Sequence, residues 1–255
     1  MIILAVDTCD SRGSLSLAVD GCPKATEFHS GDEPYSSWIF SATRALLSAG
    51  ACALNQMDAF AVANGPGSFT GVRVGISAVK ALAEVFARPV VAVSRLEVLA
   101  SQSKSQAGHV AAFFDAHRGQ VFAGLFAREA WRMRRHGEEM VARFEEFAEW
   151  VASQVRGLPV AWISPDREAG LVDAVKWREI AGQIGPAQMP LAPALGALAY
   201  EYLLRGETQD ALDLDANYVR RSDAELLWKG PAEIWKGGEP QKHSLGKKQD
   251  RKARR

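Results

Sequence analysis

A chain of 255 residues, 47% hydrophobic and 24% charged, has enough apolar material for one large domain or two small ones. Its three cysteines form no Cys-x-x-Cys pair, which argues against a disulfide framework and a cysteine zinc site and favours a reducing cytoplasm. The formal net charge is zero, but residues 241–255 carry seven Lys or Arg against one acid, so the composition indicates a mildly acidic body with a basic tail.

The opening residues and the apolar runs bear on membrane association. MIILAVDT has no basic n-region and too few apolar residues for a signal peptide, so we expect it to form a strand. No stretch of the sequence approaches the roughly 18 to 20 apolar residues that cross a bilayer. We therefore expect a cytoplasmic protein without membrane contact.

The first 105 residues alternate predicted strands and helices. Strands are expected at IILAVDT, GSLSLAVDG and PKATEFHS, with a hairpin turn at Asp20-Gly21 between the last two. A helix over residues 35–49 follows Pro34 and ends at Gly50. The strand MDAFAVANG, a glycine-rich loop, a helix over about residues 70–86 and the strand PVVAVS complete an α/β unit with a mixed sheet.

A second block extends from about residue 109 to residue 190. HVAAFFDA, GQVFAGLFA and AWRMRRHG resemble strands, RFEEFAEWVAS is helical, and PVAWIS resembles another buried strand. The pattern of residues 192–205 predicts an amphipathic helix that could return to pack on the first block. We expect a first lobe at 1–107 plus 191–228, a second lobe at 108–190, and a disordered basic tail at 229–255.

The glycine-rich loop, NGPGSFTGVRVG, precedes the helix over residues 70–86. Gly65, Gly67 and Gly71 have the spacing G-x-G-x-x-x-G, which fits neither the dinucleotide-binding fingerprint nor the Walker pattern. A helix capped by Ser68 or Thr70 can still direct backbone N–H groups at an anion. Alternatively, the glycines simply allow a tight turn.

Two helices are candidates for a partner surface. The helix over residues 70–86 has one face of small and apolar residues, at Gly71, Gly75, Ala78 and Leu82. Because glycine within a helix costs about 1 kcal/mol relative to alanine, a close contact with another helix is expected to offset it. The preceding helix has a second, partly apolar face, formed by Phe40, Thr43 and Leu47. These faces can bind a partner protein, or the helices can pack only on each other and on the sheet.

Four segments resemble the TsaB family: ILAVDTCDSRGSLSLAVDG, ANGPGSFTGVRVGISAVKALAEVFARPVVAVSRLEVLA, FFDAHRGQVFAGLF and NYVRRSDAE. TsaB is the non-catalytic subunit of the bacterial machinery that makes threonylcarbamoyladenosine in tRNA. The resemblance is strong over residues 2–126, weak over about 128–210, and present again at 217–225. It implies an actin/Hsp70-like (ASKHA) fold of two lobes, each built on a mixed sheet, with a cleft between them.

The resemblance also implies a division of labour with the catalytic relative TsaD, which carries a His-x-x-x-His metal pair on one helix face. At the equivalent place this chain has Arg95 and Leu99, neither of which is a useful metal ligand. The five histidines show no ligand spacing either. We therefore expect no metal site and no cofactor, and the ATP-derived threonylcarbamoyl-adenylate and the metal would be held by TsaD.

In the superfamily that the resemblance implies, phosphates lie between glycine-containing turns of the two lobes. The first lobe offers weak candidates for binding them, namely Asp7, Thr8, Ser11 and Gly13. Asp7 can be the relic of a metal-phosphate site or a turn-former. The second lobe offers only WISPDREAG where a glycine-rich turn is expected, so half of the cleft is missing.

Two further pairs of residues are candidates for contacts. Asp115 and Arg118 bracket a turn in DAHRGQVF, where they can contact a ligand or a partner, or form a surface ion pair worth about 0 to 1 kcal/mol. Tyr218 and Arg220 lie in an extended stretch that is expected to close the first lobe. Tyr218 is expected to pack with its hydroxyl hydrogen-bonded.

We therefore expect a scaffold that forms a pseudo-symmetric heterodimer with TsaD, joins TsaE in a larger ATP-dependent complex on tRNA, and can homodimerise when alone. The expected interface residues lie on both helices: Trp38, Phe40, Thr43, Leu47, Gly71, Val72, Gly75, Ala78, Val79 and Leu82. Gly75→Leu is then expected to block the heterodimer and leave the monomer folded. A stand-alone nucleotide-binding phosphotransferase or ATPase is the alternative function. A proteolytic role lacks both a metal pair and an identifiable Ser/His/Asp arrangement.

Overall fold

The computed structural model describes residues 1–29, 31, 33–130, 132–166, 172, 180 and 183–219. The basic tail, the predicted return of residues 220–228, Arg220 and the end of WISPDREAG lie outside the described residues. Among the helices of the described part, none is long and apolar enough to span a membrane.

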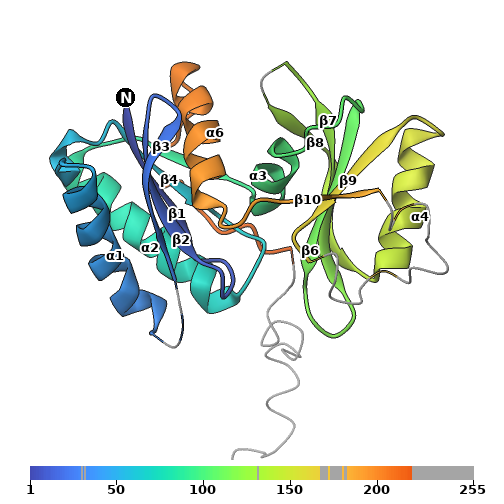
Figure 1. The fold of residues 1–255 in the computed structure, drawn as a ribbon, viewed down its shortest axis with the longest axis horizontal. Helices are drawn as coiled ribbons and strands as arrows, with labels where there is room; N and C mark the ends of the chain where they lie inside the picture. Colours follow the sequence, from blue (N-terminus) through green and yellow to red (C-terminus); the bar gives the residue numbers. More distant parts are fainter. Residues whose placement is uncertain are drawn as a thin grey trace, which may run out of the picture. The chain divides into compact units, whose positions relative to one another are not determined.

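The described strands form two five-stranded sheets with the same internal order, β3-β2-β1-β4-β5 and β8-β7-β6-β9-β10. In each sheet an antiparallel meander is extended by two strands that run parallel to its first strand. This repeated topology confirms the predicted α/β class and the actin/Hsp70-like fold with a mixed sheet in each lobe (Figure 1).

The first lobe contains the strands β1 (Ile2–Asp7), β2 (Ser14–Val19), β3 (Cys22–Phe28), β4 (Ala59–Ala63) and β5 (Val90–Val93). Its helices are α1 (Tyr35–Ala49), the short η1 (Leu54–Gln56), α2 (Phe69–Phe86) and α6 (Ala192–Leu204), and α3 (Arg95–Ser101) leads to the second lobe. The second lobe contains β6 (His109–Asp115), β7 (Val121–Arg128), β8 (Met133–Ala142), α4 (Phe144–Val155), β9 (Val160–Ser164) and β10 (Ile184–Pro186).

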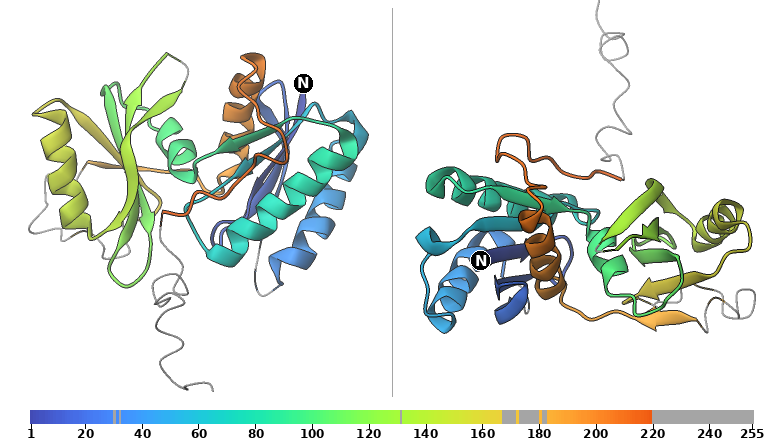
Figure 2. Two further views of the ribbon diagram at one scale, coloured as in Figure 1. Left: turned by 180° about the vertical axis from the view of Figure 1, so that it is seen from behind. Right: turned by 90° about the horizontal axis from the view of Figure 1, so that it is seen from above.

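Helices cover both faces of the first sheet, because successive side chains of a strand point to opposite sides. A Cβ added at Gly75 of α2 would lie 3.6 Å from Val6, and one added at Gly196 of α6 would lie 3.6 Å from Ala5. The two helices therefore pack on opposite faces of β1. Helix α1 lies on the same face as α2, with α6 across the sheet (Figures 1 and 2).

The hydrophobic core is continuous from the first lobe to one face of the second sheet. Val110, Ala112 and Phe114 of β6 belong to the same buried cluster as the core of the first lobe. The other face of the second sheet, with Ala111 and Phe113, packs on α4 in a separate cluster. Polar groups at the junction of the lobes are consequently buried and need partners from within the chain.

Two features of the second sheet differ from the expectation. Strand β8 continues to Ala142, beyond the predicted segment AWRMRRHG. The reason is that Gly137 lies in a β-bulge rather than at the end of the strand. The φ of Gly137 is 77°, and the register between β8 and β7 shifts opposite Gly124. The short strand β10 was not predicted. The hairpin turn of the first sheet is confirmed, with positive φ at Asp20 and Gly21.

Candidate functional site

A buried arginine lies at the carboxyl ends of the first sheet's parallel strands. Arg95 begins α3 directly after β5 and is 1% exposed. Its Nε lies 3.3 Å from Oδ2 of Asp7, at the end of β1, and its Nη2 lies 2.8 Å from Oδ2 of Asp10. The guanidinium carbon also lies 4.3 Å from the centroid of the Phe114 ring. Two carboxylates therefore share one cation in the interior.

The electrostatics of this cluster keep Arg95 and Asp10 charged. Burial disfavours the guanidinium cation, but Asp7 and Asp10 outweigh it and raise the pKa of Arg95. Burial likewise disfavours the Asp10 carboxylate, yet Arg95 and Arg12 outweigh it and hold the pKa of Asp10 below its usual range. Each member thus depends on the others, because removal of one leaves an uncompensated buried charge.

The same cluster extends to the second lobe through Arg12. Its Nη2 lies 2.6 Å from Asp10, and its Nη1 lies 2.6 Å from Oδ1 of Asp166. The other oxygen of Asp166 accepts a hydrogen bond of 2.8 Å from the backbone N–H of Asp115. The segment WISPDREAG, in which a glycine-rich turn is expected, therefore supplies Asp166, and this acid pairs with Arg12 in the β1–β2 hairpin of the first lobe.

The four weak nucleotide-binding candidates are mostly engaged within the chain. The hydroxyl of Thr8 donates to the carbonyl of Gly71 at 2.7 Å, and the N–H of Gly13 donates to the Tyr35 hydroxyl at 2.9 Å. Asp7 pairs with Arg95 as above, whereas Ser11 is exposed. The geometry favours a structural role for three of these four residues.

Arg95 and Leu99, which stand at the places expected to correspond to the two metal-binding histidines of TsaD, both have structural roles. Arg95 brings its own positive charge to Asp7 and Asp10, and Leu99 is fully buried in the core. Within the described ranges, no group of three or more His, Cys, Asp or Glu is placed to hold a metal ion.

The glycine-rich loop and the start of α2 pack closely on the segment after β1. A Cβ at Gly67 would lie 2.3 Å from the carbonyl oxygen of Cys9, and one at Gly71 would lie 2.0 Å from that of Thr8. A Cβ at Gly75 would lie 2.5 Å from the Thr8 hydroxyl. The expectation that Gly71 and Gly75 open a groove for a partner helix is therefore wrong, because these glycines admit the chain's own backbone and side chains.

The predicted partner surface divides into a buried part and an accessible part. Val72 and Val79 are 3% and 0% exposed within this chain, and Trp38 is 7% exposed and contacts the ring of Tyr35. These residues, with the two glycines, cannot present a surface without unfolding their lobe, so their assignment is corrected. Periodicity identified the faces of the two helices but not which of them turns inward. The other five predicted residues are accessible: Phe40 is exposed, and Thr43, Leu47, Ala78 and Leu82 are half-buried.

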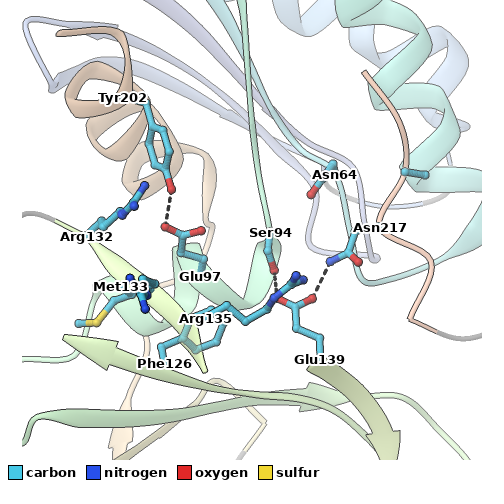
Figure 3. Close-up of a pocket in the computed structure, with 12 residues that line it drawn as sticks. Asn64, Ser94, Glu97, Phe126, Arg132, Met133, Arg135, Glu139, Tyr202 and Asn217 are labelled. Carbon is cyan, nitrogen blue, oxygen red and sulfur yellow. Dashed lines mark hydrogen bonds between the residues drawn. The ribbon is translucent and has the colours of Figure 1, made fainter. Parts of the chain in front are cut away.

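A pocket of about 510 Å³ lies between α3, β8 and α6, and sequence reasoning did not find it (Figure 3). Its polar lining comes from distant segments. Glu139, in the bulge of β8, accepts hydrogen bonds from the Ser94 hydroxyl and, at 2.5 Å, from the Asn217 amide. The Tyr202 hydroxyl donates to Oε1 of Glu97 at 2.7 Å. The one signal in the sequence is an acid, Glu97, within the otherwise apolar run LEVLA.

The two carboxyl groups of this pocket have perturbed acidities. Burial raises the pKa of Glu97 to about 7, and Glu139 contributes in the same direction, although Tyr202 and Arg132 oppose it. Burial also raises the pKa of Glu139, against the hydrogen bonds from Ser94 and Asn217. A carboxyl group that titrates near neutrality in a concave site is a feature of functional sites in general.

Two predicted contacts remain, the Asp115–Arg118 pair and the hydrogen bond of the Tyr218 hydroxyl, and the structure contains only the second of them among the described residues. Asp115 accepts a hydrogen bond of 2.6 Å from the N–H of His117, and among the described ion pairs Arg118 does not contact it. The expected Asp115–Arg118 pair is therefore wrong, since left-handed backbone at His117 and Arg118 carries the chain around the turn. The Tyr218 hydroxyl is hydrogen-bonded as expected, accepting from Nε of Arg73 at 2.7 Å.

Comparisons with known proteins agree with one another. The family model described as TsaD, tRNA N6-adenosine threonylcarbamoyltransferase, matches residues 31–159. The tRNA threonylcarbamoyladenosine biosynthesis protein TsaB of Escherichia coli K12 is 30% identical over 244 residues, which cover 90% of this chain and 97% of that protein. TsaB of Bacillus subtilis 168 is 29% identical over 232 residues, covering 89% and 98%.

Two solved structures are similar to this chain along most of its length. A Pseudomonas aeruginosa protein described as similar to the peptidase YeaZ has a TM-score of 0.69 and 29% identity, over 86% of this chain and 99% of that chain. A second structure, YeaZ from Pseudomonas aeruginosa, has a TM-score of 0.63 and 27% identity, over 85% and 99%. Both relatives are matched along almost their whole length, so the likeness extends over both sheets.

Proposed function

Because this chain belongs to the TsaB family, we propose that it takes part in making threonylcarbamoyladenosine in tRNA as the non-catalytic subunit of a heterodimer with a TsaD-type enzyme. In this proposal the adenylate donor and the metal are held by the partner, TsaE joins the pair in an ATP-dependent assembly in the cytoplasm, and tRNA is bound by that assembly. The chain contributes a surface and a rigid lobe rather than reacting groups.

The observation that carries the proposal is the guanidinium of Arg95 between Asp7 and Asp10. These carboxylates lie where the first and last parallel strands of the sheet end, an edge at which α/β proteins commonly bind ligands. Arg95 itself supplies to both carboxylates the kind of positive charge that a metal ion would bring. The arrangement supports a subunit in which the residues of an ancestral ligand-binding cleft now stabilise the fold instead of binding a ligand.

The partner surface in the proposal is the accessible part of α1 and α2. Phe40 is 73% exposed and Val85, near the end of α2, is 74% exposed, while Leu47, Ala78 and Leu82 are half-buried. Because both helices lie on the same face of the first sheet, one partner can cover both (Figure 1). A subunit of the same fold would bring a matching pair of helices to this face.

The test of the interface is co-purification with the TsaD-type subunit of the same organism. Phe40→Asp places a charge in the proposed interface and is expected to abolish co-purification, because an unpaired charge is costly to bury. Leu158→Asp is the matched control, since Leu158 is 59% exposed in the second lobe, just beyond α4. Equal recovery of TsaD with both variants would remove α1 from the proposed surface.

The test of the function is mass spectrometry of tRNA nucleosides from cells that lack this chain. Threonylcarbamoyladenosine is expected to disappear and to return with the wild-type chain but not with Phe40→Asp. The isolated wild-type chain is expected to leave tRNA unmodified when the adenylate donor is supplied. Modification by the isolated chain, or steady ATP hydrolysis by it, would contradict the non-catalytic assignment.

A further inference from the structure

The pocket between α3, β8 and α6 has an uneven distribution of charge. Two of the arginines at its rim have acidic partners outside its acidic interior: Arg132 lies 2.7 Å from Glu207 and 3.5 Å from Glu129, and Arg134 lies 3.4 Å from Glu129. These pairs neutralise that part of the rim. What is left is an acidic interior and one further arginine, Arg135.

The acidic interior consists of Glu97 and Glu139. Glu139 is 8% exposed, and its two oxygens accept from the neutral donors Ser94 and Asn217. Glu97 accepts from the neutral hydroxyl of Tyr202. Among the ion pairs of the described residues, neither carboxylate has a cation within salt-bridge distance. A buried acid, Glu139, and a half-buried acid, Glu97, thus face one pocket with hydrogen bonds but without a cation in salt-bridge contact.

A third acceptor in the pocket has no hydrogen-bond partner among the described residues. The side-chain oxygen of Asn64, at the end of β4, is buried and accepts no hydrogen bond, while its amide nitrogen donates to the carbonyl of Asp215 at 3.4 Å. A buried polar atom without a partner costs free energy unless a bound molecule satisfies it. Figure 3 shows the Asn64 side chain directed toward the same pocket as Glu97 and Glu139.

Arg135 supplies the opposite charge. It is exposed, and its positive charge acts on both Glu97 and Glu139. Within the part of the chain that the structure describes, no carboxylate lies close enough to pair with it. An apolar strip, Phe126 and Met133, completes the lining.

We propose that this pocket binds a small zwitterion of the α-amino-acid type, with its ammonium toward Glu97 and Asn64, its carboxylate on Arg135 and its side chain on Phe126 and Met133. A plain anion would leave the acidic interior unpaired, and a plain cation would leave Arg135 unpaired. A zwitterion, which has no net charge of its own, brings an ammonium to the acidic interior and a carboxylate to Arg135. The volume of the pocket is also within the range of small-molecule sites. The inference does not depend on the proposed function, since it concerns a different face of the molecule from α1 and α2.

Protonation of Glu97 adds a second, independent signature. A bound ammonium favours the carboxylate form, whereas the empty pocket holds the pKa of Glu97 at about 7. Binding therefore expels a proton below neutrality, and the affinity is expected to rise about tenfold from pH 6 to pH 8. A ligand that ignored Glu97 would show no such dependence.

The experiment is a titration of the isotope-labelled full chain, followed by NMR, with three probes that share one propyl side chain. L-norvaline carries both charges, n-butylamine only the ammonium and pentanoate only the carboxylate. L-norvaline is expected to shift the side-chain amide signals of Asn64 and Asn217 with a Kd at least about tenfold lower than either half-probe. Equal affinities for L-norvaline and pentanoate, equal affinities for L-norvaline and n-butylamine, or the lack of saturable shifts with any probe would overturn the proposal.

Variants test the two anchors separately. Glu97→Gln keeps an acceptor for Tyr202, and Arg135→Met keeps the stem of the side chain; each is expected to raise the Kd of L-norvaline about tenfold. Glu97→Gln should also remove the pH dependence. Arg134→Met is the matched control, because Arg134 is already paired with Glu129, and it should leave the Kd unchanged. A loss with Arg134→Met as large as that with Arg135→Met would overturn the assignment of the carboxylate anchor, and an unfolded variant is recognised by the collapse of its amide spectrum.

Discussion

Arg95 and Asp7 meet in the interior, 88 residues apart in the chain, with the arginine Nε 3.3 Å from the carboxylate and both side chains 2% exposed or less. The pair forms because β1 and β5 end at the same edge of a parallel arrangement, so that the first residue of α3 lies beside the last residue of β1. Arg95 therefore supplies from within the chain the positive charge that the carboxylates at this edge need. This is the observation on which the proposed non-catalytic role rests.

Arg95→Met is expected to destabilise the fold by about 3–5 kcal/mol, because Asp7 would stay fully buried without a cation, while Asp10 would keep only Arg12. Urea unfolding followed by circular dichroism measures the loss. Arg88→Met is the control, since the Arg88 side chain is exposed and, among the described residues, donates only a 3.4 Å bond to the Asn55 carbonyl; it should cost less than about 0.5 kcal/mol. Adding Asp7→Asn to Arg95→Met should recover part of the loss, and a loss below about 1 kcal/mol for the single variant would contradict this role.

Gly75→Ala is expected to destabilise the monomer by about 1–3 kcal/mol, even though alanine favours a helix by about 1 kcal/mol. The added Cβ would lie 2.5 Å from the buried hydroxyl of Thr8. Gly75→Leu adds still more volume there, so the expected intact monomer is replaced by an unfolded or strongly destabilised one. The measurement is again the free energy of unfolding in urea.

A double-mutant cycle identifies the cause of this loss. Thr8→Ala removes the atom that the new Cβ would meet, so Gly75→Ala should cost less in the Thr8→Ala background than in the wild type. Gly108→Ala is the control for a glycine with open space around it, and should change stability by less than about 0.5 kcal/mol. Additive effects of Thr8→Ala and Gly75→Ala would mean that the close contact is not the reason.

Local pattern was sufficient for most of the fold. Alternation and turn residues predicted the first hairpin, and 3.6-residue periodicity predicted α1, α2, α4 and α6, because each of these elements buries one continuous stripe or face. Local pattern did not predict which face of a helix is buried, nor which residues far apart in the chain form pairs. The helix face with Gly71 and Gly75 was assigned outward, since periodicity defines a face without defining what covers it. Long-range partners such as Asp7 with Arg95 follow from sheet topology, which no local pattern contains.

The pocket could not be predicted from local sequence pattern, for the same reason. Its polar residues come from the ends of β4 and β5, from the bulge of β8, from α6 and from the segment after it. The bulge itself was misjudged as a strand end at Gly137, and this bulge carries Glu139. A site assembled from so many elements appears only when their packing is known.

Removing the charge of the basic tail should flatten the salt dependence of tRNA binding by the assembled complex. Residues 241–255 carry seven Lys or Arg, and each phosphate contact contributes about 0.9 to the slope of log affinity against log salt. Replacing all seven by Gln keeps the length of the tail and should lower the slope by at least about 2 if several of them contact tRNA. Filter binding at a series of salt concentrations gives the slope, and an unchanged slope would exclude the tail from tRNA contact.

Glu97→Gln should change the pH dependence of stability in a defined direction. The pKa of Glu97 is raised to about 7 in the folded chain from an ordinary value near 4.5, so the folded state holds a proton that the unfolded state has lost. Its favourable contribution is fully present below the unfolded pKa and is lost as the pH rises through the folded pKa. The wild type should therefore weaken between pH 5 and pH 8 by about 2 kcal/mol relative to Glu97→Gln, which does not titrate. Urea unfolding at the two pH values measures the difference, with Glu149→Gln on the exposed face of α4 as the control that should follow the wild type. A gap between wild type and Glu97→Gln that is constant from pH 5 to pH 8, or that narrows, would show that this carboxyl group is not held in its protonated form by the fold.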